Sequence, residues 1–293
     1  MEKLKKIILF GEPPILEQLL EYISKISNIE IVSIFTDDKN FHNKNYQYKI
    51  KYCSEIKSDI ILDFIENLSA DWFISVNNYS YIIPKNILKL FPNQAINLHF
   101  GNLPEYAGRH AYQWAIRNGE IETGVCIHMM NDKYDSGPII TSCKIPINEI
   151  DTGLSIYMKL MKEGLNLTKR FINDLSQDKK FSIENQNLNN RVAYKLSDIG
   201  DGKINWKMSS NEIKNFIRAS VFDPFESPSY FAWTIYKEKK IKIKKINIIK
   251  DISCKYSESK PGSIIYIENN KFGYIAGDNK FILIEKYEIL SDE

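Results

Sequence analysis

Apolar residues in the first half of the chain form short runs that alternate with segments of helical spacing. The short runs are rich in β-branched residues and are typical of buried strands, at 7–10, 29–36, 72–76 and 95–100. Between them, apolar residues recur three or four positions apart in 15–26 and in a segment that Ser58 can cap and that continues to Leu68. Strands alternating with helices predict an α/β fold, with a Rossmann-like, mostly parallel sheet and helices on both faces.

The pattern changes beyond residue 175. Residues 154–175 carry a helical apolar pattern that Asp151 or Thr152 can cap, and residues 176–190 are polar, as in a linker. A short amphipathic helix and five closely spaced strand-like runs then predict a smaller, mainly β domain with a barrel or a curled sheet, at 213–220, 230–235, 240–249, 262–266, 272–276 and 281–286. We therefore expect an N-terminal domain at 1–175, a linker at 176–190 and a C-terminal domain at 191–293.

Composition narrows the class of protein. The chain has 293 residues, 43% of them hydrophobic and 26% charged, and its net charge of +2 gives no strong attraction to nucleic acid. Its four cysteines form no CxxC pair, so neither a zinc site nor a redox motif is indicated, and scattered thiols suit a reducing cytoplasm. The apolar run near the N-terminus is too short for a signal peptide or a membrane span. We expect a cytoplasmic protein without a membrane partner.

Candidate chemistry is concentrated in residues 95–140. Asn97 and His99 are two positions apart on a predicted strand, so their side chains project from the same face, at the end where open parallel sheets bind ligands. Asp135 begins an Asp-Ser-Gly-Pro turn. An amide donor, a base and an orienting acid suit attack of a neutral nucleophile on a carbonyl carbon. The first strand–helix loop has Gly11 but no GxGxxG, so no dinucleotide is predicted.

Five sequence blocks in a fixed order resemble the folate-dependent formyltransferase family. They are Asn97-Leu98-His99, Leu103-Pro104-Glu105-Tyr106-Ala107-Gly108, Trp114 with Asn118-Gly119-Glu120, Thr123-Gly124-Val125, and Asp135-Ser136-Gly137-Pro138-Ile139. The order makes the match specific, and a weaker likeness through Asn205-Trp206 and 260–264 extends it over most of the chain. One departure is Gly101, where many members of the family have serine.

The resemblance implies transfer of a formyl group from N10-formyltetrahydrofolate to an amine, without a metal. It implies that Asn97 donates to the formyl oxygen, that His99 assists the oxyanion or takes the proton of the attacking nitrogen, and that Asp135 holds the imidazole. Whether His99 or Asp135 is the formal base stays open. His128 lies inside a predicted strand, which favours a structural role.

The resemblance also locates binding residues. It places the folate at seven positions, which are Ser75, Asn77, Tyr79, Ile82, Leu103, Gly108 and Asp132. It places the acceptor substrate near Tyr106, Arg109 and His110. Arg109 can meet a phosphate or the folate tail, or it can be a solvated surface arginine.

Three functions compete for the chain. The first is a sugar N-formyltransferase that acts on a UDP- or dTDP-linked amino sugar for surface polysaccharide synthesis. The second is methionyl-tRNA formyltransferase, and the third is a non-catalytic binding module. The module would have lost a catalytic residue, and none is lost. Residues 36–45 form a short segment that is not strongly basic. In the lysine-rich stretch 237–250, lysines alternate with apolar residues, as they do on an exposed strand. We therefore favour a sugar nucleotide over nucleic acid as the acceptor. The C-terminal domain would shape the sugar pocket or mediate a homodimer.

Overall fold

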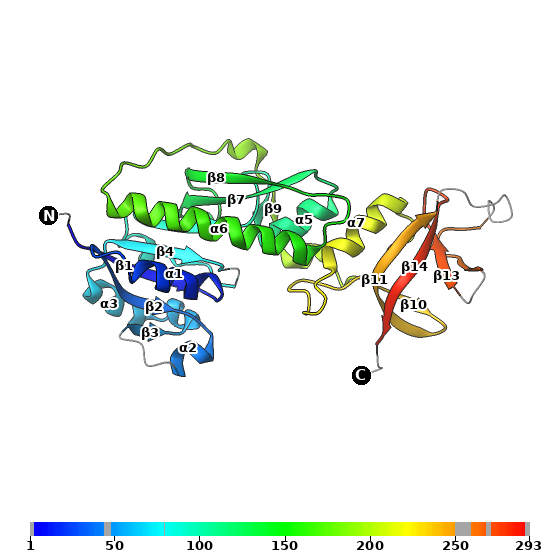
Figure 1. The fold of residues 1–293 in the computed structure, drawn as a ribbon, viewed down its shortest axis with the longest axis horizontal. Coiled ribbons are helices and arrows are strands. Elements are labelled where there is room, and N and C mark those ends of the chain that lie inside the picture. Colours follow the sequence, from blue (N-terminus) through cyan, green and yellow to red (C-terminus); the bar gives the residue numbers. More distant parts are fainter. Residues whose placement is uncertain (1–2, 44–47, 79, 250–258, 268–270, 291–293) are drawn as a thin grey trace. The chain divides into compact units, whose positions relative to one another are not determined.

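The chain forms two compact units, each assembled from separate stretches of sequence (Figure 1). The computed structural model describes residues 3–43, 48–78, 80–249, 259–267 and 271–290. Unit 1 comprises residues 1–109, 124–145 and 159–193, and unit 2 comprises residues 110–123, 146–158 and 194–293. The domain boundaries expected at 176–190 rest on composition and stay a prediction.

Unit 1 is built around a seven-stranded sheet of order β3-β2-β1-β4-β5-β7-β8. The strands are β1 (Lys5–Gly11), β2 (Ile29–Phe35), β3 (Lys49–Lys51), β4 (Trp72–Val76), β5 (Ala95–His99), β7 (Glu122–Met129) and β8 (Ile139–Pro146). The first five pair in parallel, whereas β7 runs antiparallel to β5. The predicted mostly parallel sheet is confirmed.

Helices cover both faces of this sheet. Ile8 and Phe73 share a core cluster with helix α3 (Asp59–Leu68) on one face. Trp72, which alternates with Phe73, points to the other face, where its ring centroid lies 5.5 Å from that of Phe171 on helix α6 (Gly153–Ser176). Because both faces are buried, β1 is apolar at consecutive positions, as the short-run pattern predicts.

Further helical segments are short. They are α1 (Ile15–Ile23), α2 (Lys39–Asn43), α4 (Lys85–Leu88) and the 3-10 segments Cys53–Lys57, Leu188–Asn190 and Leu196–Ile199.

The structure tests the two predicted helix caps. Ser58 precedes α3, but its side chain makes no capping hydrogen bond, so that prediction is wrong in detail. Before α6, the amide of Ser155 donates to the hydroxyl of Thr152 at 3.2 Å, which confirms one of the two predicted caps.

The polar stretch after α6 packs closely on unit 1. We call residues 181–193 the return segment. Phe181 stacks on Phe171 with ring centroids 4.6 Å apart. Glu184 exchanges two backbone hydrogen bonds of 2.8 Å with Ile139, the first residue of β8. The return segment ends in a short strand pair, β6 (Ala107–Gly108) with β9 (Ala193–Tyr194). A ring contact and backbone hydrogen bonds therefore attach this stretch to the rest of unit 1.

Unit 2 contains a five-stranded antiparallel sheet of order β10-β11-β14-β13-β12. Its elements are α5 (Ala111–Arg117), α7 (Ser210–Ser220), β10 (Trp233–Tyr236), β11 (Lys239–Ile249), β12 (Ile264–Ile267), β13 (Lys271–Ile275) and β14 (Phe281–Ile289). The side-chain amide of Gln113 on α5 donates to the carbonyl of Ala219 on α7 at 2.9 Å. The predicted mainly β region is confirmed. Across the described residues of both units, every helix is too short or too polar to cross a bilayer.

Candidate active site

The end of β5 carries the first two predicted catalytic residues. Its parallel neighbour β4 places Ser75 beside Asn97. On the other side, the antiparallel strand β7 places His128 opposite Asn97 and Cys126 opposite His99. The pairing register therefore brings a second histidine to the same end of the sheet.

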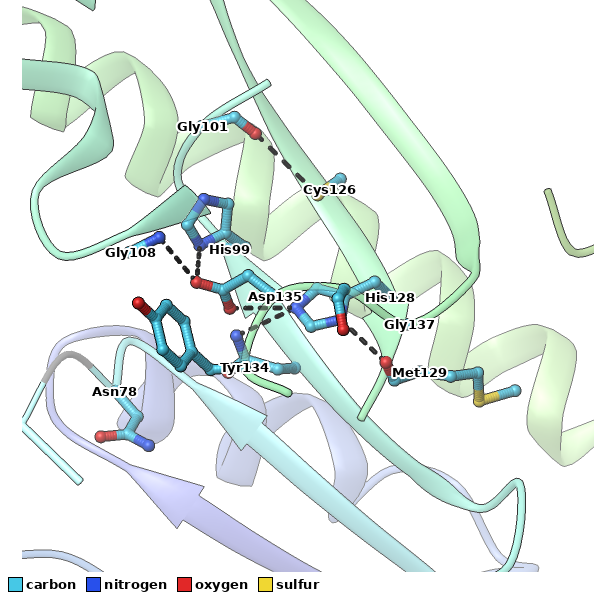
Figure 2. A network of polar contacts seen from close by, with 12 residues as sticks. Asn78, His99, Gly101, Gly108, Cys126, His128, Met129, Tyr134, Asp135 and Gly137 are labelled. Carbon is cyan, nitrogen blue, oxygen red and sulfur yellow. Dashed lines mark hydrogen bonds and ion pairs between the residues drawn. The ribbon is translucent and has the colours of Figure 1, made fainter. Parts of the chain in front are cut away.

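His99 is buried, and its ring has a defined hydrogen-bond partner. Nε2 lies 2.7 Å from the backbone carbonyl oxygen of Tyr106. A carbonyl only accepts, so Nε2 carries the hydrogen and donates it. Nδ1 faces Oδ2 of Asp135 at 3.6 Å (Figure 2). Nδ1 is therefore the basic nitrogen of the neutral ring.

Asp135 receives contacts on both carboxylate oxygens. The amide of Gly108 donates to Oδ2 at 2.8 Å, and Nε2 of His128 lies 3.5 Å from Oδ1 (Figure 2). Burial alone would raise the pKa of Asp135, but attraction to His99 and the hydrogen bond from the Gly108 amide outweigh it. The net pKa of Asp135 lies well below its usual range, so this carboxyl stays ionised.

The pKa of His99 moves in a direction that suits a base. Burial lowers it, and the opposing attraction to Asp135 compensates only in part. His99 is therefore neutral at neutral pH. It can accept a proton on Nδ1, where the neighbouring carboxylate would stabilise the resulting charge.

His128 belongs to the same cluster, which the sequence did not indicate. Its Nδ1 lies 2.9 Å from the carbonyl oxygen of Met129 and so donates to it. Its Nε2 lies 3.3 Å from the side-chain nitrogen of Asn97 and can accept from it. His128 thus orients the amide of Asn97 and contacts Asp135. Only the register between β5 and β7 reveals this role.

The residues expected to bind folate differ in how far they are exposed to solvent. Ser75 is buried within β4, and Asn77 donates to the carbonyl of Pro13 at 3.1 Å, which holds the loop after β1. Ile82 is 65% exposed on the loop after β4. Tyr79 lies outside the described residues.

Three other expected folate positions lie in the segment that follows β5 and in the loop between β7 and β8. Leu103 is buried in a small cluster with Cys126. Gly108 donates its amide to Asp135, so it contacts a predicted catalytic residue. Asp132 is exposed and forms an ion pair with Lys85 at 2.9 Å. The folate contacts of all these residues stay predictions.

The residues expected near the acceptor substrate make contacts within the protein. Tyr106 is buried, and its carbonyl holds His99. The guanidinium of Arg109 donates to the carbonyl of Ser80 at 2.8 Å, so Arg109 joins two loops of unit 1. His110 precedes α5, in unit 2, with a left-handed φ of 52°. Their contacts with a substrate stay predictions.

A second polar cluster lies beyond the carboxyl ends of β1 and β2. Ligand atoms of Glu12, Asp37 and Cys53 lie within 4.8 Å of one another. Glu12 already accepts from the hydroxyl of Thr36 at 2.9 Å and from the amide of Asp37 at 2.7 Å. The hydroxyl of Tyr81 donates to Asp37, which raises the pKa of Tyr81 to about 12, and burial raises the pKa of Cys53. These bonds tie loops together and supply no activated nucleophile.

Comparisons with known proteins identify the family of the chain. A family model described as formyl transferase matches residues 5–172, and one described as formyl transferase, C-terminal domain, matches residues 198–291. A methionyl-tRNA formyltransferase of Mycoplasma capricolum subsp. capricolum is 27% identical, over 97% of this chain and 91% of its own length.

Solved structures are similar over almost the whole chain. WlaRD, a sugar 3N-formyl transferase solved in the presence of dTDP and 5-N-formyl-THF, has a TM-score of 0.70 and 24% identity, over 99% of both chains. An N-formyltransferase from Helicobacter canadensis, in complex with folinic acid and dTDP-3-aminofucose, has a TM-score of 0.70 and 23% identity, over 96% of this chain and 98% of its own. At these identities the structures show a shared fold.

Proposed function

The chain belongs to the formyl transferase family and is a formyltransferase, and from this premise we propose that it formylates the amine of a nucleotide-linked amino sugar. The formyl donor in this proposal is N10-formyltetrahydrofolate. The observation that carries the proposal is the cluster at the end of β5, where His99 faces Asp135 and His128 contacts both Asn97 and Asp135.

Asn97 is suited to stabilise the oxyanion that forms during formyl transfer. Its side-chain nitrogen carries two hydrogens, and His128 can accept only one of them. The second N–H can donate to the oxygen of the tetrahedral intermediate. A donor of this kind typically contributes about 3 kcal/mol to the transition state.

His99 and Asp135 together handle the proton. As the neutral amine attacks the formyl carbon, Nδ1 of His99 accepts a proton from the attacking nitrogen, and Asp135 stabilises the imidazolium. The bond from carbon to the attacking nitrogen forms, and the bond to the folate nitrogen breaks. His99 then returns its proton to the departing nitrogen, so the products are the formamide and tetrahydrofolate.

One residue beside this cluster suits contact with a folate. The benzoyl ring of folate is flat and largely apolar. Ile82 presents an exposed isoleucine side chain on the loop that follows β4, the strand paired with β5. Covering a large exposed apolar side chain with a ring contributes about 25 cal/mol of favourable free energy per Å² of apolar surface removed from water. The folate pocket predicted around residues 75–82 is therefore compatible with the structure.

The lysines of unit 2 favour a sugar nucleotide over a polynucleotide. On β11, Lys244 pairs with Asp223 and Glu288, each at 2.9 Å. Lys242 lies 3.2 Å from Glu226. Binding a polynucleotide requires several cations free to contact phosphates. Carboxylates already neutralise part of this strand. Lys250, the last lysine of the basic stretch, lies outside the described residues.

A second candidate is methionyl-tRNA formyltransferase. The sequence relative named above carries that name over nearly all of this chain. In unit 2, Lys240 also lies 4.1 Å from the ring centre of Trp233, a combination of cation and aromatic that suits single-stranded nucleic acid. The acceptor therefore has to be decided by experiment.

A formyl-transfer assay separates the two candidates. Purified protein and N10-formyltetrahydrofolate are incubated with UDP- and dTDP-linked amino sugars and, separately, with methionyl-tRNA, and products are identified by mass. We expect one formyl group to be added to a sugar nucleotide. Formylation of tRNA alone would overturn the proposal. The cytoplasmic location, the role in surface polysaccharide synthesis and the homodimer stay predictions from sequence.

A further inference from the structure

The loop that carries Asp135 is held by side chains from a distant part of the chain. Nε2 of Gln186 lies 2.6 Å from the carbonyl oxygen of Gly137 and 3.3 Å from that of Asp135. Nη2 of Arg191 donates to the carbonyl of Tyr134 at 2.9 Å, and its guanidinium lies 4.9 Å from the centre of the Tyr134 ring. Two side chains of the return segment thus bind three carbonyls within four successive residues of this loop.

The return segment also contacts the loop on the other side of the site. The amide of Ala107 donates to the carbonyl of Val192 at 3.0 Å. The next residue, Gly108, donates its amide to Oδ2 of Asp135. The return segment therefore joins the loop that carries the carboxylate to the loop that orients it.

The backbone of Asp135 explains why such support is needed. Its φ of 52° lies in the left-handed region, which is uncommon for residues other than glycine, although Asp adopts it more readily than most. A conformation of this kind persists only where its surroundings fix it. The carbonyl of Asp135 itself receives one of the hydrogen bonds from Gln186.

The orientation of the Gln186 amide follows from its partners. Both contacts of Nε2 are carbonyl oxygens, which only accept, so the nitrogen must face the loop. Oε1 is buried and meets no hydrogen-bond partner among the described residues. Gln186 therefore acts on the loop as a donor.

We propose that Gln186 is a positioning residue, which keeps the carboxylate of Asp135 against His99 by binding the backbone of its loop. The proposal rests on the catalytic role proposed above for Asp135. Gln186 touches the backbone of the Asp135 loop and none of the catalytic side chains. Arg191 supports the same loop from its other end.

Two substitutions at one site test the proposal. Gln186→Ala removes the side chain, and Gln186→Met keeps most of its volume while removing the donor. Both should lower kcat by roughly 10- to 100-fold, because small displacements of a catalytic group have effects of this size, and should leave KM for both substrates unchanged. The matched control is Asn187→Ala. Asn187 is adjacent, and among the described residues its side chain accepts from the amide of Asn189, within the return segment, so turnover should stay at the wild-type value.

A second readout follows the imidazole itself. Charged and titratable groups that face His99 are Asp135, His128, Arg191 and, opposite it on β7, Cys126. Substituting the neutral Gln186 changes none of these charges. If Asp135 moves away, His99 loses its stabilising anion and its pKa falls, which NMR titration of the histidine rings measures without substrate. Arg191→Ala is less informative, since removing that cation would itself raise the pKa of His99.

The outcomes separate this proposal from the proposed function. A lower kcat with a lower pKa of His99 in both Gln186 variants supports positioning through Asp135. Wild-type kcat, or a reduced kcat with an unchanged pKa, overturns it. If Gln186→Ala does not fold, Gln186→Met decides. A shifted pKa in a protein whose wild type formylates no amine would keep the positioning role and reject the proposed function.

Discussion

Replacing Asp135 with asparagine removes one charge and keeps the shape of the side chain. Oδ2 of Asp135 lies 3.6 Å from Nδ1 of His99, and the Asp135 side chain is 13% exposed. At an effective dielectric constant of about 20, two unit charges at this distance attract by between about 4 and 5 kcal/mol. If His99 is charged in the transition state, the loss corresponds to a decrease in kcat of roughly three orders of magnitude.

Initial rates measured over a range of pH test this reasoning. Without the carboxylate, the pKa of His99 falls further, so the neutral base persists to lower pH. The acidic limb of the kcat profile of Asp135→Asn should therefore move to lower pH, below that of the wild type. KM for the amine should change little, because the charge interaction forms only as the proton transfers.

A matched substitution controls for the loss of a carboxylate elsewhere. Asp63 lies on the exposed side of α3, and Asp63→Asn should keep wild-type turnover. The reasoning fails if Asp135→Asn retains kcat within about tenfold of the wild type. It also fails if kcat falls while the acidic limb stays in place, since the carboxylate would then act other than through His99.

Other substitutions probe the oxyanion donor, the loop and the core. Asn97→Ala should lower kcat by about 10²- to 10³-fold and leave the circular dichroism spectrum unchanged. Gly137→Ala should reduce turnover while unfolding stays cooperative, because a Cβ there would lie 1.9 Å from the carbonyl oxygen of Met129 and displace the loop. Phe73→Ala should lower the free energy of unfolding in urea by about 3–5 kcal/mol, since this ring is fully buried. Ile82→Ala, at an exposed position, should change it by less than about 0.5 kcal/mol.

The sequence predicts the central strands of the sheet well because they are buried on both faces. β1 contains the continuous apolar run 7–10, and β4 is apolar except at Ser75; such runs between helical segments have few alternatives to a parallel sheet. Asn97 and His99 were placed at the end of a strand by the same pattern. Their residue types, in a fixed order with Asp135, then predicted formyl transfer through a resemblance that the family models confirm.

Parts of the site depend on pairings that the sequence does not show. His128 reaches Asn97 only because β7 runs antiparallel to β5 in one particular register. Residues 176–190 read as a linker because they are polar. The polar side chain of Gln186 binds the carbonyls of Gly137 and Asp135, which lie 49 and 51 positions earlier in the chain. The spacing of apolar residues indicates which positions are buried. It does not indicate hydrogen bonds between loops that are distant in sequence.

The order of synthesis gives the return segment a further consequence. The ribosome adds roughly 5–20 residues per second, and Gln186 follows Asp135 by 51 positions, so a few seconds separate their synthesis. A nascent chain that has reached residue 175 contains every strand of the seven-stranded sheet. It does not yet contain the side chains that bind the Asp135 loop. The strands of the scaffold are therefore all synthesised before the side chains that hold the Asp135 loop.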